Sequence, residues 1–135
     1  MKTTLVVDAS VVVQACLEAA GFDPLAKHTL IGPQLVLSEA LSALHEGAFR
    51  GELTKELARA ATERLKVAPV EVVRPEGLAA AAWEIADALG WAKTYDAEYV
   101  ALARLLDRPL LTVDARLARG AGHVVSVVGP ADILA

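Results

Sequence analysis

Two apolar stretches of the sequence each end on an aspartate. In VVDAS, residues 6–10, the run stops at Asp8, and in LLTVDAR, residues 110–116, it stops at Asp114. Short apolar runs of this kind predict buried strands, and parallel sheets bind ligands in the crevice beyond the carboxyl ends of their strands. The two carboxylates therefore favour a shared polar site at one edge of a sheet.

Two more acids lie in helical patterns between these aspartates, Glu39 in LSEAL and Asp96 in TYDAEYVALA. Each acid alone has a simpler interpretation. An aspartate at any of the three positions suits a helix N-cap. Helical periodicity turns Glu39 away from the apolar stripe of its helix and towards solvent, and it places Glu98 on a different, exposed face from Asp96. The stripe comprises Leu37, Leu41, Leu44 and Ala48. Only the combination of acids indicates a site.

The elements that would position these acids alternate between strands and helices. Helical patterns cover residues 10–20, 33–50, 54–66, 76–89 and 96–108, and strand patterns cover 4–7, 70–73, 110–113 and 124–128. The stretch 33–66 predicts a hairpin of two helices, and Gly90 closes the fourth helix. This alternation predicts an α/β fold, a three-layer sandwich with a mainly parallel central sheet flanked by helices.

Length and composition set further limits. A chain of 135 residues suits one domain, residues 1–135. Hydrophobic residues make up 55% of it, which leaves apolar surface for a partner and favours self-association. No segment has the length and apolarity of a membrane span, so we expect a soluble, cytoplasmic protein without membrane contacts. The net charge of −4 argues against coating of nucleic acid, although a basic rim or bound metal could attract phosphate.

Cysteine and aromatic residues indicate packing rather than chemistry. The single cysteine, Cys16, lies in an apolar helical pattern and is expected to be buried. The aromatic residues are too scattered for a platform that stacks single-stranded bases. They are Phe22, Phe49, Trp83, Trp91, Tyr95 and Tyr99. Trp83 and Tyr99 fit apolar helix faces, which predicts that both belong to the core.

Four segments together, VVDAS, LSEAL, TYDAEYVALA and LTVDARLA, resemble in order and spacing the acidic motifs of the PIN-domain ribonucleases. Within that family the chain resembles the toxin subunits of VapBC toxin–antitoxin pairs. The resemblance covers nearly the whole chain, and TYDAEYVALA beside LLTVDARLA is its most specific part. It implies a metal-dependent endoribonuclease with RNA as substrate, a cognate antitoxin as partner and a homodimeric assembly.

The resemblance also implies a site. The matching positions make Asp8, Glu39, Asp96 and Asp114 the catalytic and metal-binding cluster, with Ser10 and Thr112 as polar supports. Four carboxylates packed together repel one another and have raised pKa values unless a cation neutralises them. Oxygen ligands select a hard ion, so Mg²⁺ or Mn²⁺ is the expected cofactor. Such an ion polarises a phosphodiester and lowers the pKa of the attacking water, so hydrolysis needs no protein nucleophile.

Basic residues close to these acids are candidates for contacts with RNA phosphates, or are simply solvated surface residues. Lys93 precedes Asp96, and Arg116 and Arg119 follow Asp114. Some PIN branches carry an additional acid two positions after the last aspartate, where this chain has Arg116. That departure argues against a second metal ion.

Two other interpretations stay open. A receiver-like phosphoacceptor domain also places acids at strand ends around Mg²⁺, but it needs paired acids after the first strand and a late lysine. Here the first strand ends in Asp8 alone, and no lysine follows Lys93. A catalytically silent PIN-like module would only bind a protein partner. Metal-dependent cleavage of RNA distinguishes a nuclease from both.

Overall fold

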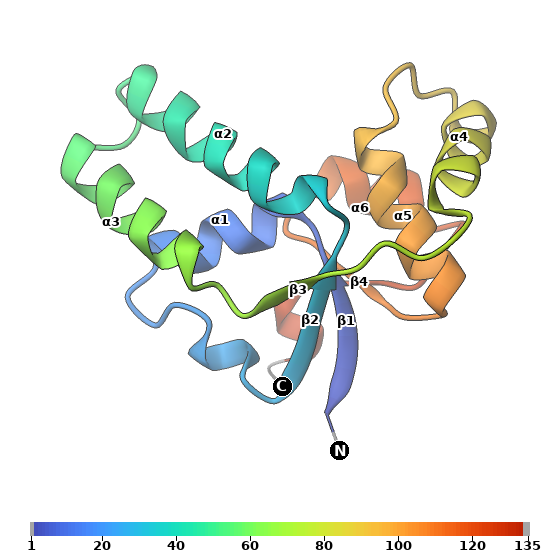
Figure 1. Ribbon diagram of the computed structural model, residues 1–135, viewed down its shortest axis with the longest axis horizontal. Coiled ribbons are helices and arrows are strands. Elements are labelled where there is room, and N and C mark those ends of the chain that lie inside the picture. The colour runs from blue at the N-terminus through green and yellow to red at the C-terminus, as the bar shows by residue number, and fades with distance from the viewer. Residues whose placement is uncertain (1, 134–135) are drawn as a thin grey trace.

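Five parallel strands form the centre of the fold (Figure 1). The computed structural model describes residues 2–133, with strands β1 (Thr3–Val7), β2 (His28–Gly32), β3 (Val70–Val72), β4 (Leu110–Leu111) and β5 (Val127–Val128). Their order across the sheet is β3-β2-β1-β4-β5, and each neighbouring pair is parallel. The prediction of a mainly parallel sheet is thereby confirmed.

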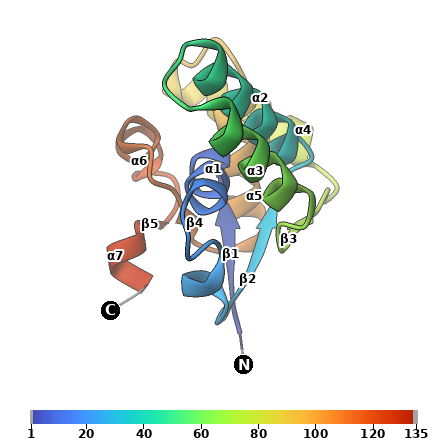
Figure 2. The ribbon, with the colours of Figure 1, turned by 90° about the vertical axis from the view of Figure 1, so that its left-hand side faces the viewer.

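Helices pack on both sides of this sheet, which confirms the predicted sandwich. Helices α1 (Ala9–Leu17), α2 (Leu35–Phe49) and α3 (Lys55–Lys66) contact one another on one side, and α4 (Leu78–Leu89) and α5 (Tyr95–Leu106) pair on the other (Figure 1). The shorter elements are a 3-10 turn (Asp23–Leu25), α6 (Ala115–Ala121) and α7 (Pro130–Ile133). In the side view of Figure 2, β5, α6 and α7 lie along one edge of the molecule and β3 along the other.

Strand β1 occupies the middle of the sheet because it is apolar on both faces. Leu5, Val6 and Val7 are all buried, and Val6 pairs with Ile31 on one side and Leu110 on the other. A near-continuous apolar run is typical of a parallel strand covered by helices on both faces. The polar residue that follows such a strand stands at the edge of the sheet, directly above the core.

The order of the strands reverses between β1 and β4. From β1 the chain builds β2 and β3 on one side, and it then crosses to build β4 and β5 on the other. In open parallel sheets the ligand crevice lies at this point, outside the carboxyl ends of the two strands. Asp8 directly follows β1, and Asp114 follows β4 after two residues. The two aspartates singled out by the sequence therefore meet at the crevice.

All five predicted helices are present, with ends shifted by a few residues. Thr54 caps α3 by accepting a hydrogen bond from the Leu57 amide at 3.1 Å. Gly90 ends α4 as predicted, in the left-handed conformation (φ 72°) that glycine adopts without strain. Among residues 2–133, no helix has both the length and the apolar character needed to cross a membrane.

Strand β2 is absent from the sequence prediction. The segment HTLIG begins with His28 and Thr29, which are only half-buried, and it continues with Leu30 and Ile31 in the core. So few apolar residues give no clear alternation, and β2 exists because its position between β1 and β3 satisfies its backbone groups on both edges.

The predicted apolar stripe of α2 is only partly buried, and one predicted core position is wrong. Leu41 is 49% exposed, because α2 extends beyond the sheet as one arm of the helical hairpin and buries Val36, Ala40 and Leu44 instead. Trp83 is 67% exposed, because α4 faces the core with its alanine, leucine and isoleucine side chains. Cys16 and Tyr99 are buried, as predicted.

Candidate active site

Asp8 is a buried carboxylate held on both oxygens. It is 4% exposed. The Ser10 hydroxyl donates to its Oδ1 at 2.6 Å, the Thr112 hydroxyl donates to its Oδ2 at 2.6 Å, and the Val11 amide donates to Oδ1 at 3.2 Å. Burial raises the pKa of Asp8, these hydrogen bonds oppose the rise, and the negative charge of Asp114 adds to it. The carboxylate is therefore fixed in orientation.

Ser10 and Thr112 also join the ends of β1 and β4. The Ser10 Oγ lies 3.3 Å from the Thr112 Oγ1 and accepts a hydrogen bond from the Val113 amide at 3.2 Å. The Thr112 Oγ1 accepts from the Asp114 amide at 3.0 Å. Each hydroxyl can donate to Asp8 and accept from the backbone at the same time. The two residues predicted as supports therefore tie Asp8 to the loop that carries Asp114.

The helix-cap interpretation also holds for two of the acids. Asp8 caps α1 through the Val11 amide, and Asp114 caps α6 by accepting from the amides of Arg116 at 2.9 Å and Leu117 at 3.2 Å. Asp96 lies within the first turn of α5, whose N-cap is Thr94. Capping and a shared site do not exclude each other, because the cap fixes one oxygen while the carboxylate still faces the crevice.

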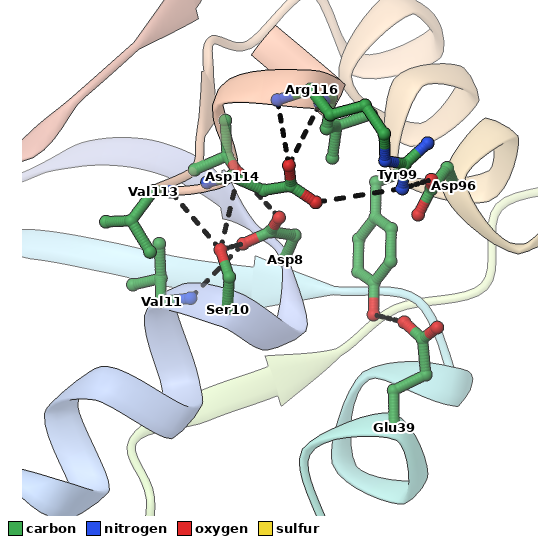
Figure 3. Close-up of polar contacts among 11 residues, drawn as sticks. Asp8, Ser10, Val11, Glu39, Asp96, Tyr99, Val113, Asp114 and Arg116 are labelled. Atoms are coloured by element: carbon green, nitrogen blue, oxygen red, sulfur yellow. Dashed lines mark hydrogen bonds and ion pairs between the residues drawn. The ribbon is translucent and has the colours of Figure 1, made fainter. Parts of the chain in front are cut away.

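Glu39 turns towards the crevice rather than towards solvent. Its Oε1 accepts a hydrogen bond of 2.5 Å from the hydroxyl of Tyr99, which is 1% exposed (Figure 3). Burial raises the pKa of Glu39; the Tyr99 hydroxyl opposes the rise, and the charges of Asp96, Asp8 and Glu98 add to it. The orientation predicted from helical periodicity is therefore wrong for Glu39, and Tyr99 positions its carboxylate.

Arg116 lies between two of the acids. Its Nη2 donates to Asp96 Oδ2 at 2.8 Å and lies 3.8 Å from Asp114 Oδ2. Figure 3 shows the Arg116 side chain between these two carboxylates. The hydrogen bond to Asp96, and the charges of both carboxylates, raise the pKa of the guanidinium. Arg116 itself is exposed, so the contact is screened by water and by salt. Arg116 thus provides a positive charge beside two of the four acids, Asp96 and Asp114.

All four acids line one hollow at the carboxyl edge of the sheet. It has a volume of about 330 Å³, and Tyr99 and Arg116 also line it. Among the described residues, no three acidic, histidine or cysteine side chains converge closely enough to hold a metal ion as they stand. The structure therefore brings the predicted set to one place, with the Arg116 guanidinium between Asp96 and Asp114.

The remaining candidates lie around this hollow. Lys93, on the loop before α5, lines an adjoining hollow together with Arg116, whereas Arg119 is exposed and lines neither of the two. Glu98 is half-buried rather than exposed, and it faces a separate groove with Arg74. Of the three basic residues proposed for RNA contacts, two therefore stand beside the acids.

Three residues of the site were not predicted as site residues from the sequence. Ser42 and Glu46 line the acidic hollow from α2, one and two turns after Glu39. Tyr99, predicted only as a core residue, contacts Glu39. The signal for Tyr99 was present, because it follows Asp96 by three residues, which places both on one side of α5.

The fold and the site together define an α/β protein of parallel topology with an acidic crevice at the point where its strand order reverses. The chain belongs to the PIN domain family, whose model matches residues 5–122. It is 35% identical to Ribonuclease VapC1 of Mycobacterium tuberculosis over 125 residues, which cover 87% of this chain and 90% of that protein.

Two solved structures share the fold of this chain. PAE2754 from Pyrobaculum aerophilum matches with a TM-score of 0.78 and 25% identity, over 99% of this chain and 96% of that one. A chain of VapBC2 from Rickettsia felis, solved with a DNA fragment from the VapBC2 promoter, matches with a TM-score of 0.66 and 12% identity, over 94% of this chain and 98% of that one. At that identity the second match supports the fold alone.

Proposed function

We propose that this protein is an endoribonuclease that uses Mg²⁺ or Mn²⁺ to hydrolyse RNA phosphodiester bonds, with residues 1–135 acting as one domain. We further propose that it is the toxin of a VapBC-type toxin–antitoxin pair. The observation that carries the proposal is the meeting of Asp8, Glu39, Asp96 and Asp114, from four separate elements, around one hollow. The similarity to a relative named as a ribonuclease supports it.

The donor set fits a hard divalent cation. The acids offer only oxygen, which suits Mg²⁺ or Mn²⁺ and disfavours softer metals. Asp8, Asp96 and Asp114, with Glu39 directly or through water, would hold the ion. Burial is the main cause of the raised pKa of Asp8 and Glu39, and the neighbouring carboxylates add to it, so a cation bound among these acids would favour their charged forms. A bound ion would lower the pKa of the attacking water and stabilise the leaving oxygen.

The chain's own residues supply the positioning. Ser10 and Thr112 keep Asp8 from rotating, because they hold both of its oxygens. Tyr99 holds one oxygen of Glu39, and the other accepts no hydrogen bond from residues 2–133. Preorganised carboxylates need little rearrangement during the reaction, which lowers its barrier. Lys93 stands where the negatively charged RNA backbone would approach.

The proposal is tested by incubating the purified protein with a pool of structured RNAs in Mg²⁺, in Mn²⁺ and in chelator, beside the Asp96→Asn variant. We expect cleavage by the parent protein with either metal, none in chelator and very little by the variant. Cleavage that persisted in chelator would refute metal dependence. A folded parent protein that cut no RNA under any condition would favour the silent protein-binding module.

Removal of Arg116 is expected to strengthen metal binding. In Arg116→Ala, Asp96 and Asp114 lose the cation that competes with the metal, so affinity for Mn²⁺ should rise about three- to tenfold at low salt. Calorimetry measures the change, which should shrink at high salt because the contact is exposed. Arg119→Ala removes the same charge from α6 without touching either carboxylate and serves as the control. Equal Mn²⁺ affinity in the parent and Arg116→Ala would contradict the competition.

The helical hairpin formed by α2 and α3 is expected to carry the protein partners. It exposes Leu41, Phe49 and Leu57 at its surface, and clustered exposed apolar side chains mark interaction sites. We propose that it serves a homodimer and the docking of the antitoxin. Light scattering of Phe49→Ser should show weaker dimerisation than Trp83→Ser, which also removes a large exposed aromatic side chain, but from α4. A parent protein that is monomeric at micromolar concentration and binds no product of the adjacent reading frame would contradict this assignment.

A further inference from the structure

A second hollow opens beside the acidic hollow. It has a volume of about 540 Å³, within the range of small-ligand sites, and it shares Glu39, Asp96 and Arg116 with the acidic hollow. Its other wall comes from the loop between α4 and α5 and from the first residue of α5. An RNA strand with one phosphate over the acids would extend into this second hollow.

The outer wall presents an exposed aromatic ring. Tyr95 is 55% exposed, although its neighbour Trp91 is half-buried. Trp91 is held in place because it packs on the backbone of α6, where a Cβ added at Gly120 would lie 2.8 Å from the indole Cζ2. Among the described residues the only stacked ring pair is His45 with Phe49, on α2. The face of Tyr95 is thus available to a planar ligand.

The same wall carries positive charge. Lys93 is exposed and makes no ion pair within residues 2–133, and Arg116 reaches the hollow from α6. The whole chain has a net charge of −4, so these two basic side chains contrast with its overall negative charge. An aromatic face beside backbone-binding cations is the combination that proteins use for single-stranded nucleic acid.

We propose that this second hollow is a nucleotide subsite, in which the base next to the scissile phosphate stacks on Tyr95 while Lys93 and Arg116 contact the adjoining phosphates. This inference rests on the proposed function. Its new content is the role of Tyr95, which holds the unpaired base beside the scissile phosphate. Stacking on a ring tolerates any base, so the subsite selects an accessible nucleotide rather than a sequence.

Binding of RNA tests the subsite directly. The probe is a short fluorescein-labelled single-stranded RNA of mixed sequence, and every variant carries Asp8→Asn, which suppresses cleavage and lies outside the second hollow. We expect Tyr95→Ala to weaken binding about five- to twentyfold and Tyr95→Phe to stay within about twofold of the parent, because the ring and not the hydroxyl stacks. Trp83→Ala is the matched control, since Trp83 is exposed but lines another groove.

A second probe separates stacking from a general loss of structure. RNA with abasic positions offers no base to stack, so Tyr95→Ala and the parent should bind it equally. In otherwise unmodified protein, Tyr95→Ala should raise the RNA concentration needed for half-maximal cleavage and leave the maximal single-turnover rate nearly unchanged. Equal binding of intact RNA by Tyr95→Ala and the parent, or no RNA binding by the parent, would overturn the subsite. If Tyr95→Ala bound RNA as tightly as the parent and cleaved it normally, the subsite would be overturned. The proposed nuclease function would then still stand.

Discussion

Amide replacement of any one of the four acids is expected to lower the single-turnover rate of RNA cleavage about 100-fold or more under saturating Mn²⁺. The variants are Asp8→Asn, Glu39→Gln, Asp96→Asn and Asp114→Asn. Each amide keeps the shape of the side chain and removes its charge. A lost metal ligand removes several kcal/mol of charge stabilisation in the transition state, and each ~1.4 kcal/mol is about tenfold in rate.

The fold should survive these changes, because removing one charge from an acidic cluster relieves like-charge repulsion. Circular dichroism checks this. Glu98→Gln is the matched control: Glu98 lies two residues from Asp96 but faces the groove of Arg74, so its amide should cut RNA nearly as fast as the parent. Four folded amide variants with the parent's rate would rule out the proposed site.

Divalent metal is expected to raise the melting temperature by roughly 10 °C when its concentration is about 100 times its dissociation constant. A ligand that binds only the folded state stabilises it, by about 2.7 kcal/mol at that ratio. Asp8→Asn should lose most of the response, since Asp8 is the most deeply buried of the acids. Scanning calorimetry with Mg²⁺, Mn²⁺ and Ca²⁺ measures the shift. No shift with saturating Mg²⁺ and Mn²⁺, together with no heat of binding, would contradict a metal site.

Acid should weaken this metal effect. Burial raises the pKa of both Asp8 and Glu39. Protons therefore compete with the metal for these two carboxylates at a higher pH than for exposed acids. In the metal-free protein, by contrast, these two groups should raise the free energy of unfolding as the pH falls. A carboxyl whose pKa is higher in the folded than in the unfolded state adds stability as the pH falls through its folded pKa. Melting curves with and without metal should therefore converge as the pH is lowered.

The strand-end aspartates were predictable because the neighbouring residues determine their positions. A run such as Thr4–Val7 is too apolar for anything but a buried strand, and a polar residue that ends it must stand at the edge of the sheet. The same reasoning applies to Asp114. The parallel topology followed from the alternation of strands and helices, and the structure has it throughout residues 2–133.

Contacts between distant elements were not predictable in this way. Glu39 is held at the crevice by the hydroxyl of Tyr99 on α5, which lies 60 residues further along the chain. Periodicity within α2 records only which side of that helix is apolar, and it placed Glu39 in solvent. The contact of Arg116 with Asp96, across 20 residues, likewise depends on how α6 leaves β4. Strand β2 gave no clear periodic signal because only two of its residues, Leu30 and Ile31, are large apolar core residues.

The most direct test of the central claim, that four acids form one metal site, is anomalous diffraction from crystals soaked in Mn²⁺. We expect a single strong peak between Asp8, Asp96 and Asp114, at coordinating distance from their carboxylates, with the Arg116 guanidinium displaced from its place between Asp96 and Asp114. A map with no peak among these side chains at saturating Mn²⁺, or with Arg116 still bound to both carboxylates and manganese elsewhere, would contradict it.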